Sequence, residues 1–417
     1  MTAVEASEKT VLPSGIRVVT ERMPEASSVA TGVWVGVGSR DETDELSGAS
    51  HFLEHLLFKG TEERSARSIA TAIDAAGGEM NAFTSREHTA FYTRLPVDRL
   101  DFALSLLTDV VSRPAFREGE VEAEREVILE EILMSEDAPD DVAITALYES
   151  LFPAHGVGRE TLGTRTTIGA MPRYEIVAFH HRHYRPANLV VAAAGDLSHD
   201  QVVESVSGFF ADAEAGARPG RQAPTEQPVA QRVITRPTEQ AHVAIGWRGL
   251  DYDDPDRYAL WVANHVAGGG MSSRLFQEVR EERGLAYTVY TSPSSYQDCG
   301  SVTLYAGTSP QRLSELFDVV NQVIDDLLAL GITAEEHEVA TGFLTGSLLL
   351  GLEDTGSRMV RLGSSETSRD EVIPVEEHLA RIRAVTPDDV HRVLRRVFGG
   401  AHTSVVVGPF ADGVPQL

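Results

Sequence analysis

Hydrophobic and polar positions repeat with two different periods along the chain, and these periods predict both strands and helices. In residues 29–38, valines alternate with glycine and tryptophan, which is the two-residue period of a strand. Residues 98–111, 117–134 and 311–330 carry apolar side chains three and four positions apart, as helices packed on one side do. Pro114 separates the first two helices. Hairpin-joined strands with grouped helices indicate the α+β class.

The same order of elements occurs twice, at an offset close to 213 residues. Trp34, in the expected strand 29–38, corresponds to Trp247, in an expected strand 242–248. The other matches are Tyr92 with Tyr305, Arg99-Leu100 with Arg312-Leu313, and Gly195 with Gly408. Four matches at one offset, in the same structural contexts, favour internal duplication over coincidence.

A stretch rich in proline and glycine separates the two copies. Residues 214–230 contain three prolines and two glycines, which disfavour both a helix and a strand ladder. We therefore expect an N-terminal domain at 1–213, a linker at 214–230 and a C-terminal domain at 231–417. Each domain is expected to be an α/β sandwich, in which an antiparallel-rich sheet carries grouped helices.

Composition narrows the classes of partner. The 417 residues include 36 Lys and Arg against 63 Asp and Glu, a formal net charge of −27 that opposes nucleic acid and anionic membranes and favours cationic partners. No apolar stretch approaches the roughly 18 residues that span a bilayer. Met1 to Leu12 lacks the features of a secretory or organellar targeting segment, and Cys299 is the only cysteine. We expect a cytoplasmic protein that binds neither nucleic acid nor membrane.

Candidate chemistry enters at His51-Phe52-Leu53-Glu54-His55. Two histidines four residues apart lie about 40° apart around a helix, so both imidazoles can reach one metal ion. Glu54 precedes the second histidine, so its carboxylate can lie beside a water at the metal without being a ligand. Taken alone, the pattern also fits two surface histidines on an amphipathic helix.

A catalytic zinc site usually has three protein ligands, so the histidine pair needs a third. The acidic helix expected at 118–136 offers candidates, and helical angles place Glu124 and Glu131 within or beside its buried face. That face is defined by Val121, Ile128 and Ile132, whereas Glu122, Glu126 and Glu130 point away and are expected to be solvated. A carboxylate facing the core needs a cation, so both Glu124 and Glu131 remain candidates on this reasoning.

The stretch Gly48–Thr61 resembles the pitrilysin and insulysin superfamily of inverted-motif zinc peptidases, most closely its short branch that includes mitochondrial processing peptidase. The resemblance covers nearly the whole chain and extends to Gly77, Gly78, Asn81, Ala82 and Thr84. A family glutamate some 76 or 77 residues after the second histidine completes the zinc site, which implies one Zn²⁺ per chain held by His51, His55 and Glu131. The glutamate seven residues earlier implies a supporting catalytic role for Glu124.

The resemblance implies a zinc-dependent endopeptidase that acts on peptides or unfolded segments, with Glu54 as general base. The family fold is a pair of homologous α+β domains of the processing-peptidase type, which agrees with the repeat. Family members bind a peptide as an added strand along an edge strand. This implies substrate contacts from Asn81, Ala82, Phe83 and Thr84.

The second copy lacks the metal motif, which implies one metal site per chain. Its Arg280 and Tyr287 resemble the paired Arg and Tyr with which the family contacts the substrate carbonyl, although ion pairing of Arg280 with Glu281 is a simpler role. A closed chamber requires two chains, so a homodimer is expected. The alternatives are a heterodimer with an inactive homologue and a non-catalytic scaffold or assembly subunit of the same fold.

Several further side chains near these motifs have no assigned role. The sequence does not decide whether Glu87 and His88 touch substrate. The cluster His180, His181 and His183 is expected to be structural, because its spacing does not fit a closed metal site.

Overall fold

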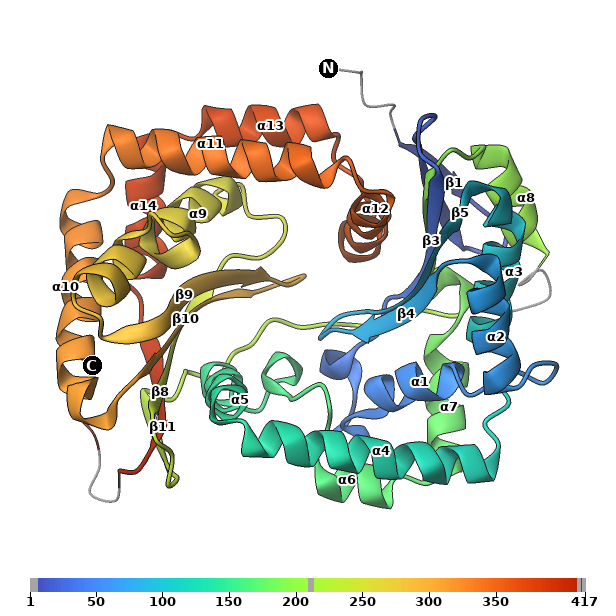
Figure 1. Ribbon diagram of the computed structural model, residues 1–417, viewed down its shortest axis with the longest axis horizontal. Helices are drawn as coiled ribbons and strands as arrows, with labels where there is room; N and C mark the ends of the chain where they lie inside the picture. Colours follow the sequence, from blue (N-terminus) through green and yellow to red (C-terminus); the bar gives the residue numbers. More distant parts are fainter. Residues whose placement is uncertain (1–6, 209–213, 411–413, 415–417) are drawn as a thin grey trace. The chain divides into compact units, whose positions relative to one another are not determined.

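The computed structural model describes residues 7–208, 214–410 and 414 (Figure 1). Residues 1–6, part of the segment expected to carry no targeting signal, lie outside this range. The chain divides into two compact units, and each is assembled from three segments. The first unit is Met1–Ile132, Arg159–Gly220 and Leu349–Val375, and the second is Leu133–Gly158, Arg221–Leu348 and Glu376–Leu417.

These two units differ from the continuous domains expected from the sequence, 1–213 and 231–417, because two segments are exchanged between them. Residues 133–158 belong to the second unit and residues 349–375 to the first. The chain also passes from the first unit to the second at Gly220, inside the stretch 214–230, which contains no helix or strand. Each exchanged segment carries a helix that covers one face of a sheet, so each sheet is closed by a helix from the other half of the sequence.

A six-stranded sheet forms the centre of the first unit. Its order is β1 (Glu8–Val11), β2 (Arg17–Arg22), β6 (Leu189–Gly195), β3 (Ser28–Val35), β5 (Thr89–Pro96) and β4 (Glu79–Thr84). Only β2 and β6 pair in parallel, so the sheet is antiparallel-rich as expected. Strand β4 lies at the edge and pairs with β5 so that Asn81 is opposite Tyr92. One side of β4 is therefore open to a further strand.

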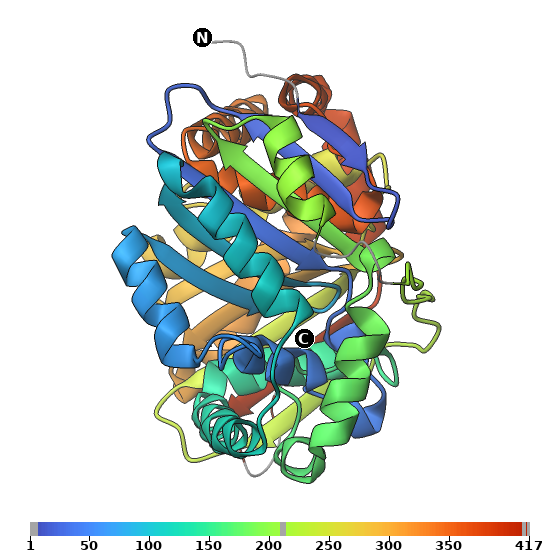
Figure 2. The same cartoon turned by 90° about the vertical axis from the view of Figure 1, so that its right-hand side faces the viewer.

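Helices cover both faces of this sheet (Figures 1 and 2). The alternation along β3 places Val33 and Val35 in a core with α1 (Ala49–Leu57), α3 (Leu100–Ser112) and α8 (His199–Ser207), and Trp34 in a core with α12 (Thr355–Arg369). The strand expected at 29–38 is thus confirmed over 29–35, where β3 ends, and both faces of the strand are buried. The remaining helices of the first unit are α2 (Ala66–Ala76), α6 (Arg165–Ala170) and α7 (Arg173–His183), and α4 (Glu118–Asp137) begins in it.

The second unit repeats this topology. Its sheet has the order β7 (Gln231–Thr235), β11 (His402–Gly408), β8 (Ala241–Gly249), β10 (Gly300–Thr308) and β9 (Ala286–Ser295), which matches β2, β6, β3, β5 and β4. Trp34 and Trp247 occupy the equivalent strands β3 and β8, so the duplication inferred at the 213-residue offset holds in the strand order.

Helix α5 (Pro139–Leu151) packs on β8 and β11, and α14 (Pro387–Val397) packs on α9 (Arg257–Asn264) and α10 (Leu313–Leu330). The other helices of this unit are α11 (Ala334–Gly351) and α13 (Val375–Ala384), with π-helical turns η6 (His265–Gly269) and η7 (Phe276–Glu282). In the part of the chain that the structure describes, no helix is long and apolar enough to cross a membrane.

Candidate metal centre

Helix α1 carries the two motif histidines, and its first residue is set by Gly48. This glycine has φ 94°, and a Cβ there would lie 2.7 Å from the carbonyl oxygen of Leu162, so the turn requires glycine. Phe52, Leu53 and Leu56 are buried in the core beneath the sheet, which orients the helix. The opposite part of the helix surface then presents His51 and His55 together, with ring centroids 4.7 Å apart.

A buried glutamate holds the beginning of α1. The carboxylate of Glu42 accepts hydrogen bonds from the backbone N–H of Gly48 at 2.8 Å and of Ser50 at 2.7 Å. Both N–H groups belong to the first turn, where a helix has no carbonyl partners of its own. Glu42 therefore acts as a side-chain cap and fixes the residue adjacent to His51.

The two histidines converge on Glu131 of α4. The Nε2 atoms of His51 and His55 are each 3.6 Å from Oε2 of Glu131. Potential ligand atoms of the three residues all lie within 4.8 Å of one another, and this is the one such group found among the described residues. The Glu131 side chain is 43% exposed, so it lies beside the buried face of α4 and at an accessible position.

Glu124 contacts the cluster through the other ring nitrogen of His55. It is 5% exposed, and its Oε2 accepts a hydrogen bond from Nδ1 of His55 at 3.0 Å, while Oε1 is 2.5 Å from Nζ of Lys59. A proton on Nδ1 leaves the lone pair of His55 on Nε2, the atom that faces Glu131. Helical angles left both glutamates as candidates for the third ligand. The geometry distinguishes them, because Glu131 faces Nε2 of both histidines and Glu124 contacts Nδ1 of His55.

Glu54 approaches the cluster from the same helix. Its Oε2 accepts a hydrogen bond of 2.6 Å from the hydroxyl of Thr84 at the end of β4. Burial raises the pKa of Glu54 above its ordinary value, and the bond from Thr84 opposes this shift. Burial, and secondarily His55, lowers the pKa of His51 to about 4, so His51 is neutral near pH 7, which is the form that binds a metal.

These donors fit a zinc ion. Two imidazole nitrogens and one carboxylate oxygen are a ligand set of catalytic zinc, which keeps a fourth position open. Glu124 supplies the carboxylate partner that a zinc-bound histidine usually has on its second nitrogen. Glu131 lies against His51, which is neutral, so a cation between the histidines would also balance the charge of this carboxylate.

The expected substrate residues lie along β4 and face different ways. The N–H of Ala82 donates to Oδ1 of its own neighbour Asn81 at 2.8 Å, so it points away from β5. Because such groups alternate along an antiparallel strand, the backbone groups of Met80, Ala82 and Thr84 lie on the open edge. The side chain of Phe83 packs on the face of the sheet that α12 covers, with its ring 6.3 Å from that of Tyr92, whereas the side chain of Ala82 packs on the other face.

Residues of undecided role near this strand make structural contacts. Glu87 is buried in an ion pair with Arg40 at 2.6 Å. His88 lies edge-on to Phe83, with ring centroids 5.7 Å apart. His180 is buried and its Nε2 is 2.9 Å from the carbonyl oxygen of Val111, as expected of a structural histidine.

Arg280 and Tyr287 belong to the second unit and contact each other there. The Arg280 guanidinium lies 4.6 Å from the centroid of the Tyr287 ring and 4.8 Å from that of Phe276. Its Nε is also 3.5 Å from a carboxylate oxygen of Glu281, the simpler partner expected from the sequence. Tyr287 is 78% exposed, so the pair presents a guanidinium and a phenol at the surface of its unit.

Three contacts of the site were not foreseen. Thr84 was expected to touch substrate, but it also holds Glu54, and no local pattern indicates a bond across 30 residues. Lys59 follows His55 by four residues, so helical spacing could have suggested that it shares a neighbour with His55. The cap from Glu42 carries no sequence signal, because it reaches α1 from outside the usual capping positions.

Comparison with known proteins places this site in a family. Residues 17–165 match the family "Insulinase (Peptidase family M16)" and residues 170–341 match "Peptidase M16 inactive domain". A relative in Streptomyces coelicolor, named an uncharacterized zinc protease, is 45% identical over 97% of this chain and 90% of its own length. A relative of the same description in Bacillus subtilis is 39% identical over 95% of this chain and 97% of its own. The chain belongs to the M16 peptidase family.

Two solved structures have the same fold. The peptidase M16 inactive domain from Pseudomonas fluorescens superposes with a TM-score of 0.92 at 22% identity, covering 99% of this chain and 100% of that one. A protease from Helicobacter pylori also gives 0.92 at 22% identity, covering 98% and 100%. The family matches and the relatives confirm the resemblance to the pitrilysin superfamily, and the solved structures confirm the fold of two homologous α+β domains. The histidine and glutamate cluster lies within the first M16 range, and Arg280 and Tyr287 lie within the range described as inactive.

Proposed function

We propose that this M16 protein is a zinc-dependent endopeptidase that cleaves peptides or unfolded segments. The observation that carries the proposal is the convergence of the His51 and His55 Nε2 atoms on Oε2 of Glu131, with Glu54 held beside them by Thr84. The names of the relatives, uncharacterized zinc proteases, support the same metal and the same class of reaction.

The residues divide the chemistry between them. When bound by His51, His55 and Glu131, zinc would polarise the scissile carbonyl and make a water more acidic. Glu54 accepts the proton of the attacking water and returns it to the leaving amine, and a raised pKa suits both transfers. Thr84 orients the Glu54 carboxylate, and Glu124 keeps the His55 lone pair on Nε2.

The open edge of β4 would bind the substrate backbone. An extended peptide added to this edge can pair with the outward groups of Met80, Ala82 and Thr84. Asn81 would release the N–H of Ala82 to a substrate carbonyl. Backbone pairing tolerates many sequences and requires an extended chain, so peptides and unfolded segments are the substrates.

We further propose that two chains form the working enzyme. Among the described residues there is one candidate metal group per chain, and Arg280 and Tyr287 are placed on the unit that lacks it. In a homodimer these two side chains would donate hydrogen bonds to the substrate carbonyl at the site of the other subunit. A heterodimer with an inactive homologue is the alternative assembly.

Peptide digestion by the zinc-loaded protein tests the proposal. The protein should contain one zinc per chain and cleave a mixed peptide library, read by mass spectrometry, and a chelator should abolish cleavage. Glu54→Gln keeps the size and removes the base, so it should retain zinc while turnover falls by orders of magnitude. A protein without stoichiometric zinc, or one that Glu54→Gln leaves fully active, would contradict the proposal and favour a non-catalytic scaffold.

A further inference from the structure

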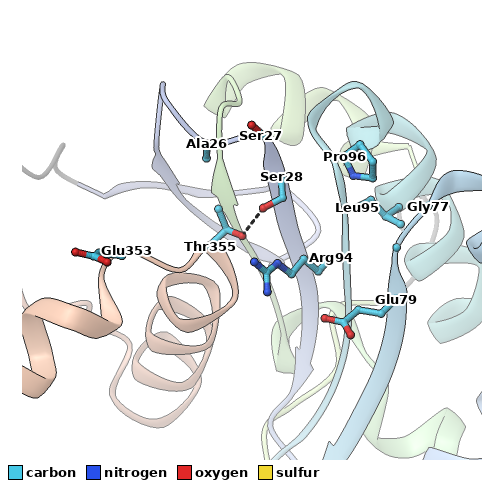
Figure 3. A pocket seen from close by; sticks show the side chains of 11 residues that line it. Ala26, Ser27, Ser28, Gly77, Glu79, Arg94, Leu95, Pro96, Glu353 and Thr355 are labelled. Carbon is cyan, nitrogen blue, oxygen red and sulfur yellow. Dashed lines mark hydrogen bonds between the residues drawn. The ribbon is translucent and has the colours of Figure 1, made fainter.

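A cavity of about 660 Å³ lies in the first unit at the beginning of β4 (Figure 3). Thr84 lies at the opposite end of this strand. Its walls include Glu79 of β4, Arg94 of β5 and Thr355, the first residue of α12. Thr355 is joined to Ser28 of β3 by a hydrogen bond of 3.0 Å between their hydroxyls. The cavity is therefore built from strands and a helix end that pack on one another.

Two exposed acidic side chains line the cavity, Glu79 of β4 and Glu353 in the turn before α12, and Glu79 is the one on the strand with the open edge. Arg94 lies 3.1 Å from a carboxylate oxygen of Asp354, so its positive charge is paired. Glu79 is exposed, and it makes no ion pair among the residues that the structure describes. Figure 3 shows Glu79 and Arg94 projecting to the same side from neighbouring strands. The carboxylate of Glu79 thus remains available to a cationic ligand.

The same strand connects this cavity to the metal centre. Thr84 binds Glu54 at one end of β4, and Glu79 lies five residues earlier, about 17 Å away along an extended strand. A peptide paired with the open edge would run past both. Its side chains would alternate between the two faces of the sheet, so every second one would point to the face of Glu79 and Asn81.

We propose that the cavity is a subsite for a lysine or arginine side chain of the substrate strand. This proposal rests on the endopeptidase function above and deepens it. Antiparallel pairing, the more stable arrangement, would run the substrate from Thr84 towards Glu79, so the cationic residue lies three to six positions after the cleaved bond. The alternation of side chains restricts the preference to every second position within that window. The charge complementarity is between the substrate cation and Glu79.

A positional peptide series tests the subsite. Each peptide has the same cleavage sequence, and lysine or glutamate is placed in turn at the third, fourth, fifth and sixth positions after the cleaved bond. Rates with lysine should exceed those with glutamate about two- to fivefold, the range of an exposed ion pair, and only at positions of one parity. Equal rates for the lysine and glutamate peptides at all four positions would overturn the proposal. The same lysine preference at two adjacent positions would also overturn it.

Variants of Glu79 test the partner. Glu79→Gln should bring the ratio of the lysine to the glutamate cleavage rate to about one, and Glu79→Lys should invert this ratio. Glu62 is an exposed glutamate outside the cavity, so Glu62→Gln should keep both the ratio and the overall rate. The ratio within one variant is independent of any change in overall activity. An unchanged ratio in both Glu79 variants would reject the subsite.

A shorter peptide separates this proposal from the function on which it rests. A peptide that ends two residues after the cleaved bond does not extend to Glu79, so its zinc-dependent cleavage reports on the metal centre alone. Cleavage of this peptide together with an absent lysine preference would overturn the subsite and leave the endopeptidase. Failure to cleave any peptide, long or short, would overturn both.

Discussion

At the residue scale, the candidate metal centre places two glutamates of one helix in different surroundings. Glu131 faces the Nε2 atoms of both histidines, whereas Glu124 contacts Nδ1 of His55 and Nζ of Lys59. A direct ligand contributes a metal bond, whereas its neighbour acts through the orientation of the imidazole. Removing each carboxylate should therefore affect metal binding to different degrees.

We expect Glu131→Gln to lose stoichiometric zinc, because the amide removes the charged oxygen on which the histidines converge. Glu124→Gln should keep zinc with an affinity about 10- to 100-fold lower. Zinc affinity, measured by competition with a chromophoric chelator, compares the two variants with the parent. If Glu131→Gln binds zinc as tightly as the parent while Glu124→Gln does not, the two roles must be exchanged.

At the element scale, the position of α1 depends on its cap, Glu42, which lies six residues before Gly48 in the sequence. Replacing Glu42 with alanine leaves the N–H groups of Gly48 and Ser50 buried without an acceptor. The expected cost is about 1–3 kcal/mol of stability, with a loss of zinc affinity because the first turn of the helix can shift. Urea unfolding and the chelator assay measure the two effects.

Glu45→Ala is the matched control for this change. Glu45 is exposed and lies three residues away in the same loop, so its removal should alter neither stability nor zinc affinity. An equal loss in both variants would show that the acidic loop as a whole, rather than the cap, supports the helix.

The packing of α12 on the first sheet depends on a glycine. A Cβ at Gly363 would overlap the ring of Trp34, which is fully buried between β3 and this helix. Gly363→Ala should therefore destabilise the protein by about 1–3 kcal/mol despite the better helix propensity of alanine. Urea unfolding measured by circular dichroism provides the test.

A second helical glycine gives the opposite expectation. Gly342 in α11 has open space around its Cβ position, so Gly342→Ala should be neutral or stabilise by up to about 1 kcal/mol. If both substitutions change stability by the same amount and sign, close packing against Trp34 is not what requires Gly363.

At the scale of the whole molecule, the proposed dimer distributes one reaction over two chains. If Arg280 and Tyr287 serve the partner's metal centre, a Glu54→Gln homodimer lacks a base and an Arg280→Ala, Tyr287→Phe homodimer lacks the carbonyl donors. Both should be severely impaired. Mixing them should restore activity, because a mixed dimer contains one site with zinc, Glu54 and both donors intact.

Native mass spectrometry verifies that subunits have exchanged in the mixture, and peptide cleavage measures recovery. Exchange without recovered activity would reject the shared site, since every site would then lack either the base or the donors of its own chain. A protein that remains a monomer throughout would reject the dimer itself.

The metal motif and the duplication could be derived from the sequence because both depend on short-range order. Two histidines four residues apart share a helix face whatever surrounds them, and repeated periodicity survives in the strands of Trp34 and Trp247. Helical angles also separated the solvated Glu122, which is exposed, from the buried Glu124. The choice of Glu131 as third ligand came from family resemblance rather than from spacing.

Tertiary structure decided which distant residues meet. The exchange of residues 133–158 and 349–375 between the units depends on where the chain returns, and periodicity shows only that their helices have apolar faces. Likewise the bond from Thr84 to Glu54 and the cap from Glu42 to α1 need a β-strand edge and a loop to be placed beside one helix. The local pattern by itself determined which residues could hold a metal. Long-range packing determined which carboxylate faces the histidines, because that distance depends on how α1, α4 and β4 lie against one core.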